Sequence, residues 1–175
     1  MGNKGRGERG ASLVELAFAL PILIMLLVGL VSSGIAYNHQ LALTHAAREG
    51  GRYGATLPVN PGSMDDWLEI VINQTVADAT GALDSGVDGR YVCVAYVHPN
   101  GTAAGDTTTR RILDTGLQSS QGGQQCFASG DGRPDDERRV QVVVRRNTDF
   151  SVVFFSSVLN LDAQAVNRFE AALGS

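Results

Sequence analysis

The chain is 175 residues long, with a formal net charge of −4 at pH 7 and a hydrophobic content of 43%. This length suits one small domain beside a membrane anchor, because the first quarter of the chain holds a large share of the apolar residues. Residues 1–10 are basic, whereas residues 38–175 hold eleven arginines against sixteen acidic residues. The acidic excess of this longer part argues against nucleic-acid binding.

The first predicted element is a membrane-spanning helix. The sequence from Arg9 to Gly34 is an almost unbroken apolar run, centred on Leu16–Val31. About 20 apolar residues, each adding about 1.5 Å of rise, cross the hydrocarbon core of a bilayer. Pro21 removes one helix hydrogen bond, which membrane helices tolerate. Because basic residues precede the helix, we expect the N-terminus in the cytoplasm and the C-terminal domain outside the inner membrane.

An ordinary secretory signal peptide is the alternative for this segment. The small residues Ser32, Ser33, Gly34 and Ala36 would suit cleavage at its far end. The apolar region is longer than the roughly 7–15 residues of such a signal, which favours a spanning helix.

One carboxylate, Glu15, interrupts the start of the apolar run. A charge at the centre of a bilayer costs about 2.5–3.5 kcal/mol on insertion scales, so such residues usually have a function. Glu15 could instead lie a turn or so inside the interface, where headgroups and the helix N-terminus tolerate negative charge. The residues that precede Glu15 favour the functional interpretation.

These residues resemble the N-terminal signal of type IV prepilins. Residues 4–9 supply a short basic leader, Gly10 ends it, and Glu15 is the fifth residue counted from Ala11. The resemblance implies cleavage between Gly10 and Ala11 by a membrane aspartic prepilin peptidase. The cut would leave a free amino group on Ala11, and Glu15 of a neighbouring subunit would pair with it. Such a pairing makes two costly charges tolerable and fixes the axial register of an assembly.

The continuation of the helix narrows the resemblance. The stretch Ala46–Ala55, AAREGGRYGA, looks like the segment that follows the anchoring helix in the TadE family of tight-adherence (Tad/Flp) pilus systems. The resemblance implies that Arg48 and Arg52 form juxtamembrane contacts within or between subunits. A solvated helix end with local ion pairs, each worth a few tenths of a kcal/mol, is an equal alternative. Gly50 and Gly51 predict that the helix stops there.

The remaining sequence predicts an α+β fold. A helix is expected from Met64 to about Ala82, and strands at Arg90–His98, Arg138–Arg146 and Leu161–Glu170. The expected organisation is a basic leader (1–10), a transmembrane and juxtamembrane helix (11–53), a linker (54–62) and an exported domain (63–175). In that domain the second helix would pack on an antiparallel sheet of about three to four strands.

Two other segments are expected to contain no strand. Thr102–Asp136 is polar and rich in Gly, Thr and Gln, which predicts a long surface loop. The residues of Phe150–Leu159 suit either a strand or a short helix, and we expect a short helix or loop between the last two strands. Its aromatic residues are expected to pack in the core, and contact with the membrane or a partner is the alternative.

Cys93 and Cys126 are the only cysteines. Both lie in the predicted exported part, where disulfides persist, so we expect a bond that ties the long loop to its strand. A buried Cys93 with a free Cys126 is the alternative. The absence of a CxxC pair gives no support for zinc or thioredoxin chemistry. The acidic cluster between Asp131 and Glu137 lacks the EF-hand spacing, so it does not predict a calcium site.

The sequence contains no motif typical of catalysis, so we expect no enzymatic activity and no cofactor. The expected function is that of a TadE-like pseudopilin, with TadF-like and TadG-like pseudopilins as alternatives. Its expected partners are a prepilin peptidase, other pseudopilins or pilins, the inner-membrane Tad assembly platform and the lipid bilayer. The rival hypothesis is an uncleaved, membrane-anchored envelope protein with an exported binding or sensor domain.

Overall fold

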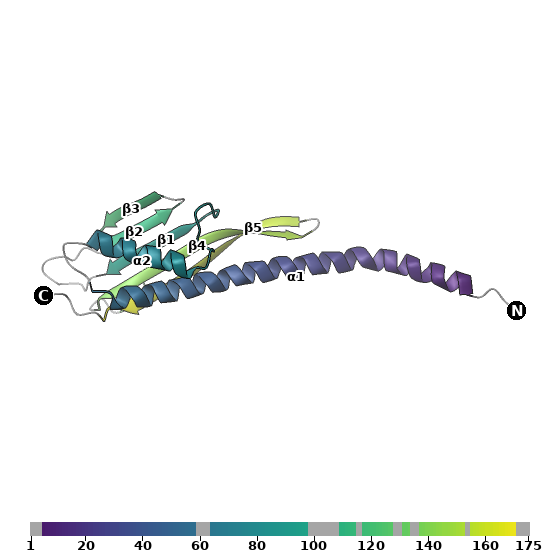
Figure 1. Ribbon diagram of the computed structural model, residues 1–175, viewed down its shortest axis with the longest axis horizontal. Helices are drawn as coiled ribbons and strands as arrows, with labels where there is room; N and C mark the ends of the chain where they lie inside the picture. The colour runs from purple at the N-terminus through teal and green to yellow at the C-terminus, as the bar shows by residue number, and fades with distance from the viewer. Residues whose placement is uncertain are drawn as a thin grey trace.

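The computed structural model describes residues 5–58, 64–97, 109–114, 117–127, 131–133, 137–152 and 155–170 (Figure 1). A long helix carries a second helix and a five-stranded antiparallel sheet at its C-terminal end. The elements are α1 (Gly5–Thr56), α2 (Met64–Asp78), β1 (Tyr91–Val97), β2 (Thr109–Asp114), β3 (Leu117–Gly122), β4 (Arg139–Val152) and β5 (Phe155–Arg168). This architecture confirms the predicted α+β class.

The helix α1 has two different halves. Residues 11–28 are exposed throughout, and Ala11–Thr56 contains an 18-residue stretch with a mean hydropathy of 2.6, which is apolar enough to cross a membrane. The second half belongs to the core of the folded domain, where Leu43, Ala46 and Ala47 are completely buried. α1 therefore joins the candidate membrane span to the domain as one continuous helix, and Pro21 does not interrupt it.

The prediction that α1 stops at Gly50 and Gly51 is wrong, because the helix continues to Thr56. Both glycines lie where α1 crosses its neighbours. A Cβ atom on Gly50 would collide with the Thr75 side chain of α2, and one on Gly51 would lie 2.5 Å from Asn167 Oδ1 of β5. The missing side chains therefore allow close packing rather than ending the helix.

Replacing Gly50 with valine should test this crossing. We expect the free energy of unfolding to fall by about 1–3 kcal/mol, because the added methyl groups would overpack the contact with Thr75. Gly34→Val is the matched control, since nothing lies within 4 Å of a Cβ atom there. Denaturant unfolding of the full-length proteins in detergent measures both changes. Equal stability of the two variants would contradict a packing role for Gly50.

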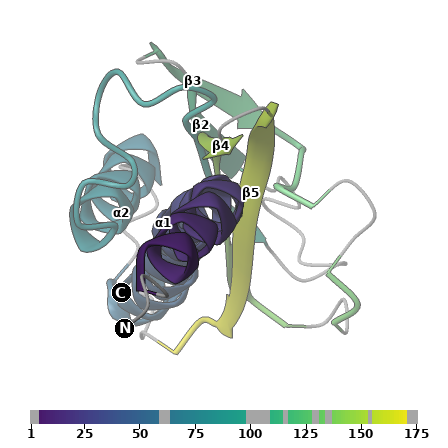
Figure 2. The same cartoon turned by 90° about the vertical axis from the view of Figure 1, so that its right-hand side faces the viewer.

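Both helices cover one face of the sheet, as Figure 2 shows. The strand order is β3-β2-β1-β4-β5, with every neighbouring pair antiparallel. Alternate residues of β1 and β4 face the helices and are almost completely buried: Val92, Val94, Tyr96, Val140, Val142 and Val144. Trp67 of α2, Tyr96 and Phe169 pack edge to face at the end of this core, with ring centroids 5.2–6.5 Å apart. The core therefore lies between the sheet and the paired helices.

The opposite face of the sheet, called the outer face below, has a smaller core. Cys93 and Ala95 of β1 and Val143 of β4 are buried there beneath Cys126 and Phe127. We call residues 123–133 the cover segment, of which 128–130 lie outside the described residues. Among the described residues, Cys126 and Phe127 of the cover segment shield this small core, and neither helix packs on it.

Three predicted elements need correction. Thr102–Asp136 is not a loop throughout, because β2 and β3 lie within it and extend the sheet to five strands in the described part of the chain. Phe150–Leu159 is not a helix or loop, because its described residues form the end of the β4–β5 hairpin. α2 ends at Asp78 rather than near Ala82, and the chain turns through Thr80 and Gly81, which have positive φ angles.

Candidate functional site

The predicted assembly charge, Glu15, lies on the exposed half of α1. Ala11 precedes it by one turn of the same helix, so both residues share one face. Leu16 and Phe18, which follow Glu15, are exposed large apolar residues. No ion pair within the described part of the chain includes Glu15. The structure thus presents one carboxylate on an apolar helix surface with no described ionic partner in its own subunit.

The proposed processing site is continuous with this helix. Gly10 and Ala11 both lie within α1, which begins at Gly5. Cleavage between them would place the new amino group at the first residue of the remaining helix, where it has no preceding turn.

The juxtamembrane arginines lie on the solvent side of α1. Arg52 Nη2 is 2.9 Å from Glu49 Oε2, and the two side chains are 74% and 37% exposed. An exposed pair of this kind contributes only a few tenths of a kcal/mol. Arg48 is exposed and lines a shallow hollow of about 390 Å³ with Leu41 and His45. The Arg48 and Arg52 side chains lie outside the domain core, where a neighbouring subunit can reach them.

The structure joins Cys93 of β1 to Cys126 of the cover segment, with an S–S distance of 2.05 Å. The two cysteines are 33 residues apart in the sequence. The bond attaches the cover segment to the centre of the outer face.

A second attachment of the cover segment was not anticipated from the sequence. Asp131 Oδ2 accepts hydrogen bonds from Arg139 Nε at 2.6 Å and from Gln141 Nε2 at 2.7 Å. The Asp131 and Arg139 side chains are 1% and 3% exposed, and Gln141 is fully buried. Gln141 Oε1 also accepts from the backbone N–H of Cys126 at 3.1 Å. In the sequence, the one signal that could have revealed this network is the glutamine within the valine-rich stretch of β4.

The charge of Asp131 is stabilised in the folded state. Burial raises the pKa of its carboxyl group, but hydrogen bonds from Gln141, the Arg133 backbone and Arg139, together with the Arg139 charge, outweigh burial. The pKa of Asp131 therefore lies below its ordinary value. This carboxylate is already occupied by protein donors, so its role is structural.

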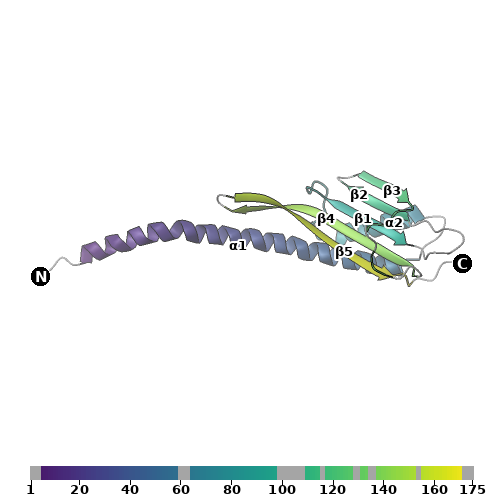
Figure 3. The same cartoon turned by 180° about the vertical axis from the view of Figure 1, so that it is seen from behind.

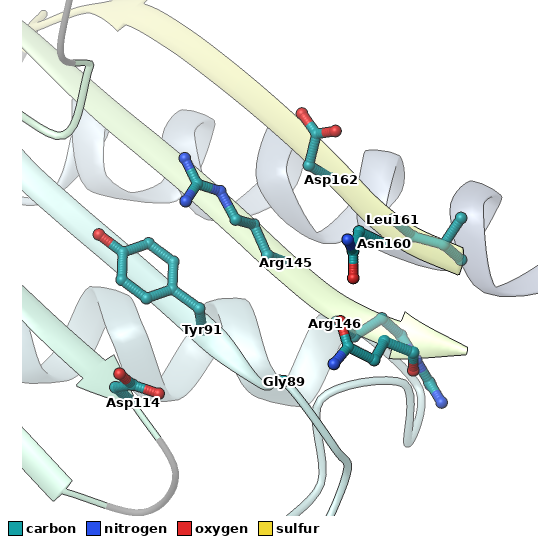
Figure 4. A pocket seen from close by; sticks show the side chains of 9 residues that line it. Gly89, Tyr91, Asp114, Arg145, Arg146, Asn160, Leu161 and Asp162 are labelled. Atoms are coloured by element: carbon teal, nitrogen blue, oxygen red, sulfur yellow. The ribbon is translucent and has the colours of Figure 1, made fainter. Parts of the chain in front are cut away.

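Four polar side chains, called the polar row below, lie side by side on the outer face at the end of the sheet where β1 begins: Asp114, Tyr91, Arg145 and Asp162 (Figure 4). The strand register places Asp114 of β2 beside Tyr91 of β1, Tyr91 beside Arg145 of β4, and Arg145 beside Asp162 of β5. The Arg145 guanidinium carbon lies 5.1 Å from the centre of the Tyr91 ring. The row lines an open depression of about 540 Å³. Sequence reasoning missed it, because its members come from four separate strands.

The chemistry that this row can perform is limited. Tyr91, Arg145 and the two aspartates can offer hydrogen bonds and charge to a small polar group. None of them belongs to a nucleophile–base pair, and the described residues contain no group of three or more His, Cys, Asp or Glu side chains suited to a metal ion. The depression therefore offers hydrogen-bonding and charged groups of both signs side by side.

Comparison with protein families gives a match to the model described as TadE-like protein, over residues 10–52. The N-terminal segment of this chain is TadE-like. The match confirms the predicted TadE-like resemblance of this segment and covers Gly10, Glu15, Arg48 and Arg52, all on α1. It ends close to the point where α1 crosses α2. No curated protein and no solved structure matches the chain significantly.

The TadE-like segment therefore includes parts of both halves of α1. Its first part is the exposed apolar helix, and its last part packs into the domain core. TadE-like proteins are pilus components, which connects this chain generally to a Tad pilus system. The sheet, the disulfide and the polar row all lie outside the matched residues.

Proposed function

We propose that this protein is a pseudopilin of a Tad/Flp-type pilus assembly system, processed after Gly10 and assembled through the apolar half of α1. The observation that carries the proposal is the TadE-like match over a helix whose first half is exposed, apolar and marked by Glu15. The proposed topology is a single pass through the inner membrane with the N-terminus in the cytoplasm and the domain outside.

The charge on Glu15 supplies the assembly mechanism. An ionised carboxylate on an apolar helix is costly in a low-dielectric environment unless an opposite charge pairs with it. Processing after Gly10 would create that charge as the amino group of Ala11. Within one helix these groups lie a full turn apart, whereas a neighbouring helix shifted along its axis can bring them into direct contact. The pairing would define the axial stagger between subunits.

The other partners follow from the position of each part. A prepilin peptidase would act at the Gly10–Ala11 bond on the cytoplasmic side. The Tad assembly platform and other pseudopilins or pilins would contact α1 in the membrane. Arg48 and Arg52 would then lie just outside the bilayer, where they can contact an adjacent subunit.

An uncleaved envelope protein with an exported binding domain is the second candidate. The polar row of Tyr91, Arg145 and Asp162 favours it, because this open depression can hold a small polar ligand. That function would need the anchor helix but neither cleavage nor Glu15.

The N-terminal residue of the mature protein separates these candidates. We expect mass spectrometry of protein from native membranes to give Ala11 as the first residue. A chain that begins at Met1 or Gly2 would remove the amino group beside Glu15 and favour the anchored binding protein. A strain without the prepilin peptidase is the control, and its protein should retain residues 1–10.

The Glu15→Gln substitution tests the assembly charge itself. We expect loss of pili while the protein remains at normal abundance in the membrane, because glutamine has similar size but cannot form the ion pair. Electron microscopy counts the pili, and immunoblotting of membrane fractions measures the protein. Glu15→Asp is the matched control and should retain part of the assembly. Normal piliation by a stable Glu15→Gln protein would refute the mechanism.

A further inference from the structure

The end of the β4–β5 hairpin reaches beyond the rest of the sheet. β4 pairs with β1 only as far as Arg145, whereas β4 and β5 continue as a two-stranded ribbon to the pair Val152–Phe155. Figures 1 and 3 show this ribbon extending along α1 towards the N-terminal end of the helix. We call the described residues 149–152 and 155–158 the hairpin tip.

The hairpin tip lies beside the part of α1 that is expected to be inside the membrane. Ser32 Oγ donates a hydrogen bond of 2.6 Å to the backbone oxygen of Ser151. Phe150 and Val152 line a shallow groove of about 330 Å³ with a set of α1 residues: Met25, Leu26, Gly29, Leu30 and Ser33. Nearer the domain, His39 Nδ1 lies 3.3 Å from Thr148 Oγ1. The ribbon and the helix therefore run together from the level of His39 down to the apolar run.

The rise per residue of α1 gives the depth of the hairpin tip relative to the outer boundary of the hydrocarbon core. A span of about 20 residues that starts near Leu13 ends near Ser32, at about 1.5 Å per residue. Gly29 and Met25 then lie about 5 Å and 10 Å below that boundary. Ser151 bonds to Ser32 and therefore lies at that boundary, and Phe150 and Val152 on either side of it line a groove with this stretch of α1. Val152 lies about 3 Å deeper than Ser151, so the hairpin tip reaches the boundary and begins to enter the bilayer.

The sequence of the hairpin tip suits this position. Phe155 and Val158 are 61% and 54% exposed, so the expectation that this apolar cluster packs in the core is wrong for both. Between Asn147 and Asn160 the only charged residue is Asp149. Asp149 precedes Val152 by three residues, or about 10 Å along a strand, which places the charge at the headgroups when Val152 is among acyl chains.

We infer that the hairpin tip enters the outer leaflet of the bilayer beside α1 and forms a second membrane contact of the exported domain. The occupant of its exposed apolar surface is lipid, because the surface is continuous with the lipid-facing helix. The open strand edges limit insertion to the interfacial region, since unpaired backbone groups are costly in hydrocarbon. The Ser32 hydroxyl satisfies one of these groups, the Ser151 carbonyl. A depth of about 5–10 Å is typical of interfacial elements.

This contact would fix the domain against the membrane until the subunit is extracted. The inference rests on the membrane-spanning helix of the proposed function, although it requires neither cleavage nor pairing of Glu15. It predicts a domain that is held to the bilayer at two points, rather than one that rotates freely on a single helix.

Tryptophan fluorescence in lipid vesicles tests the inference. The full-length chain carries Phe155→Trp and is reconstituted into phosphatidylcholine–phosphatidylglycerol vesicles with bromine on the acyl chains. Leu117→Trp is the matched control, because Leu117 is 77% exposed on β3 at the far edge of the sheet. Leu23→Trp, at an exposed apolar position of α1, reports whether the helix itself is in the bilayer. The native Trp67 is 3% exposed and contributes the same background to all three.

We expect the Phe155→Trp and Leu23→Trp variants to lose fluorescence to brominated lipid. Quenching of the Phe155→Trp variant should be strongest with bromine near the headgroup end of the acyl chain, because the hairpin tip lies at interfacial depth. The Leu117→Trp variant should keep its intensity in brominated lipid and respond only to aqueous iodide.

Three outcomes would overturn the inference. In the first, brominated lipid quenches the Leu23→Trp variant, but the Phe155→Trp variant behaves like the Leu117→Trp control. The inference would then be wrong, although α1 would still span the membrane. In the second, the emission of the Phe155→Trp variant is blue-shifted but brominated lipid does not quench it. This result would also overturn the inference, because a protein partner would then cover the hairpin tip. If neither the Leu23→Trp nor the Phe155→Trp variant were quenched, the inference would fall together with the membrane-spanning role of α1.

Discussion

The Asp131→Asn variant should lose about 3 kcal/mol or more of its free energy of unfolding at neutral pH. Removing one partner of a buried ion pair costs about 3–5 kcal/mol, because the other charge stays buried after losing its opposite charge. Here that charge is Arg139, whose side chain is 3% exposed. Asp131 Oδ2 receives hydrogen bonds from Arg139 and Gln141. The neutral oxygen of asparagine would accept these bonds more weakly than a carboxylate does. Since domains are stable by only about 5–15 kcal/mol, this loss is large.

The pH dependence has a defined direction. The pKa of Asp131 is lowered in the folded state, so its stabilising contribution is fully present above the ordinary aspartate pKa of about 3.9. That contribution disappears as the pH falls through the folded-state pKa. The difference in stability between wild type and Asp131→Asn should therefore be constant near neutrality and should shrink in acid. Denaturant unfolding of the full-length protein in detergent at several pH values measures this difference.

Asp114→Asn is the matched control for this experiment. Asp114 is an exposed carboxylate of the same sheet, and the described ion pairs do not include it. Its replacement should change stability by less than about 0.5 kcal/mol. If the two variants were equally stable, the buried pair would not hold the cover segment in place.

Replacing both Cys93 and Cys126 with serine is expected to lower the free energy of unfolding by about 2–5 kcal/mol, the usual cost of losing a disulfide from a small exported domain. The bond closes a loop between residues 33 apart, which limits the unfolded chain, and Cys93 is completely buried on the outer face. Serine adds a hydroxyl group to that apolar site, so the substitution is unfavourable in the folded state as well.

Reduction separates these two contributions. A reducing agent should lower the stability of the wild type towards that of the double variant and should leave the double variant unchanged. A wild type that is equally stable with and without reductant would contradict a stabilising role of the disulfide. Because Asp131 and Cys126 belong to the same cover segment, combining the two sets of substitutions should cost less than the sum of their separate effects.

The cover segment explains why these effects should be large. The helices pack on one face of the sheet, and Cys126 and Phe127 of the cover segment pack over the second core around Cys93, Ala95 and Val143 on the other. The disulfide and the Asp131–Arg139 pair attach this segment at two points. Losing either one would loosen the outer face while α1 and α2 remain packed on the other.

The sequence by itself determined the long apolar helix and its TadE-like resemblance. A long apolar run, a basic leader and Glu15 are local signals, because the bilayer sets the length and the composition of any helix that crosses it. Strand β1 and the centre of β4 were also predictable, since short alternating or valine-rich apolar stretches indicate strands. The two cysteines, both in the predicted exported part, suggested the disulfide.

Only the tertiary structure decided the remaining features. β2 and β3 have polar sequences whose strand state depends on pairing with β1, a contact between distant residues. Gly50 and Gly51 resemble a helix end in isolation, yet the closeness of α2 and β5 explains them as packing positions within α1. The hairpin tip and the Asp131–Arg139–Gln141 network likewise consist of residues far apart in sequence. Composition and periodicity report local preference and burial, whereas these contacts depend on which faces meet, and that is fixed only when the chain folds.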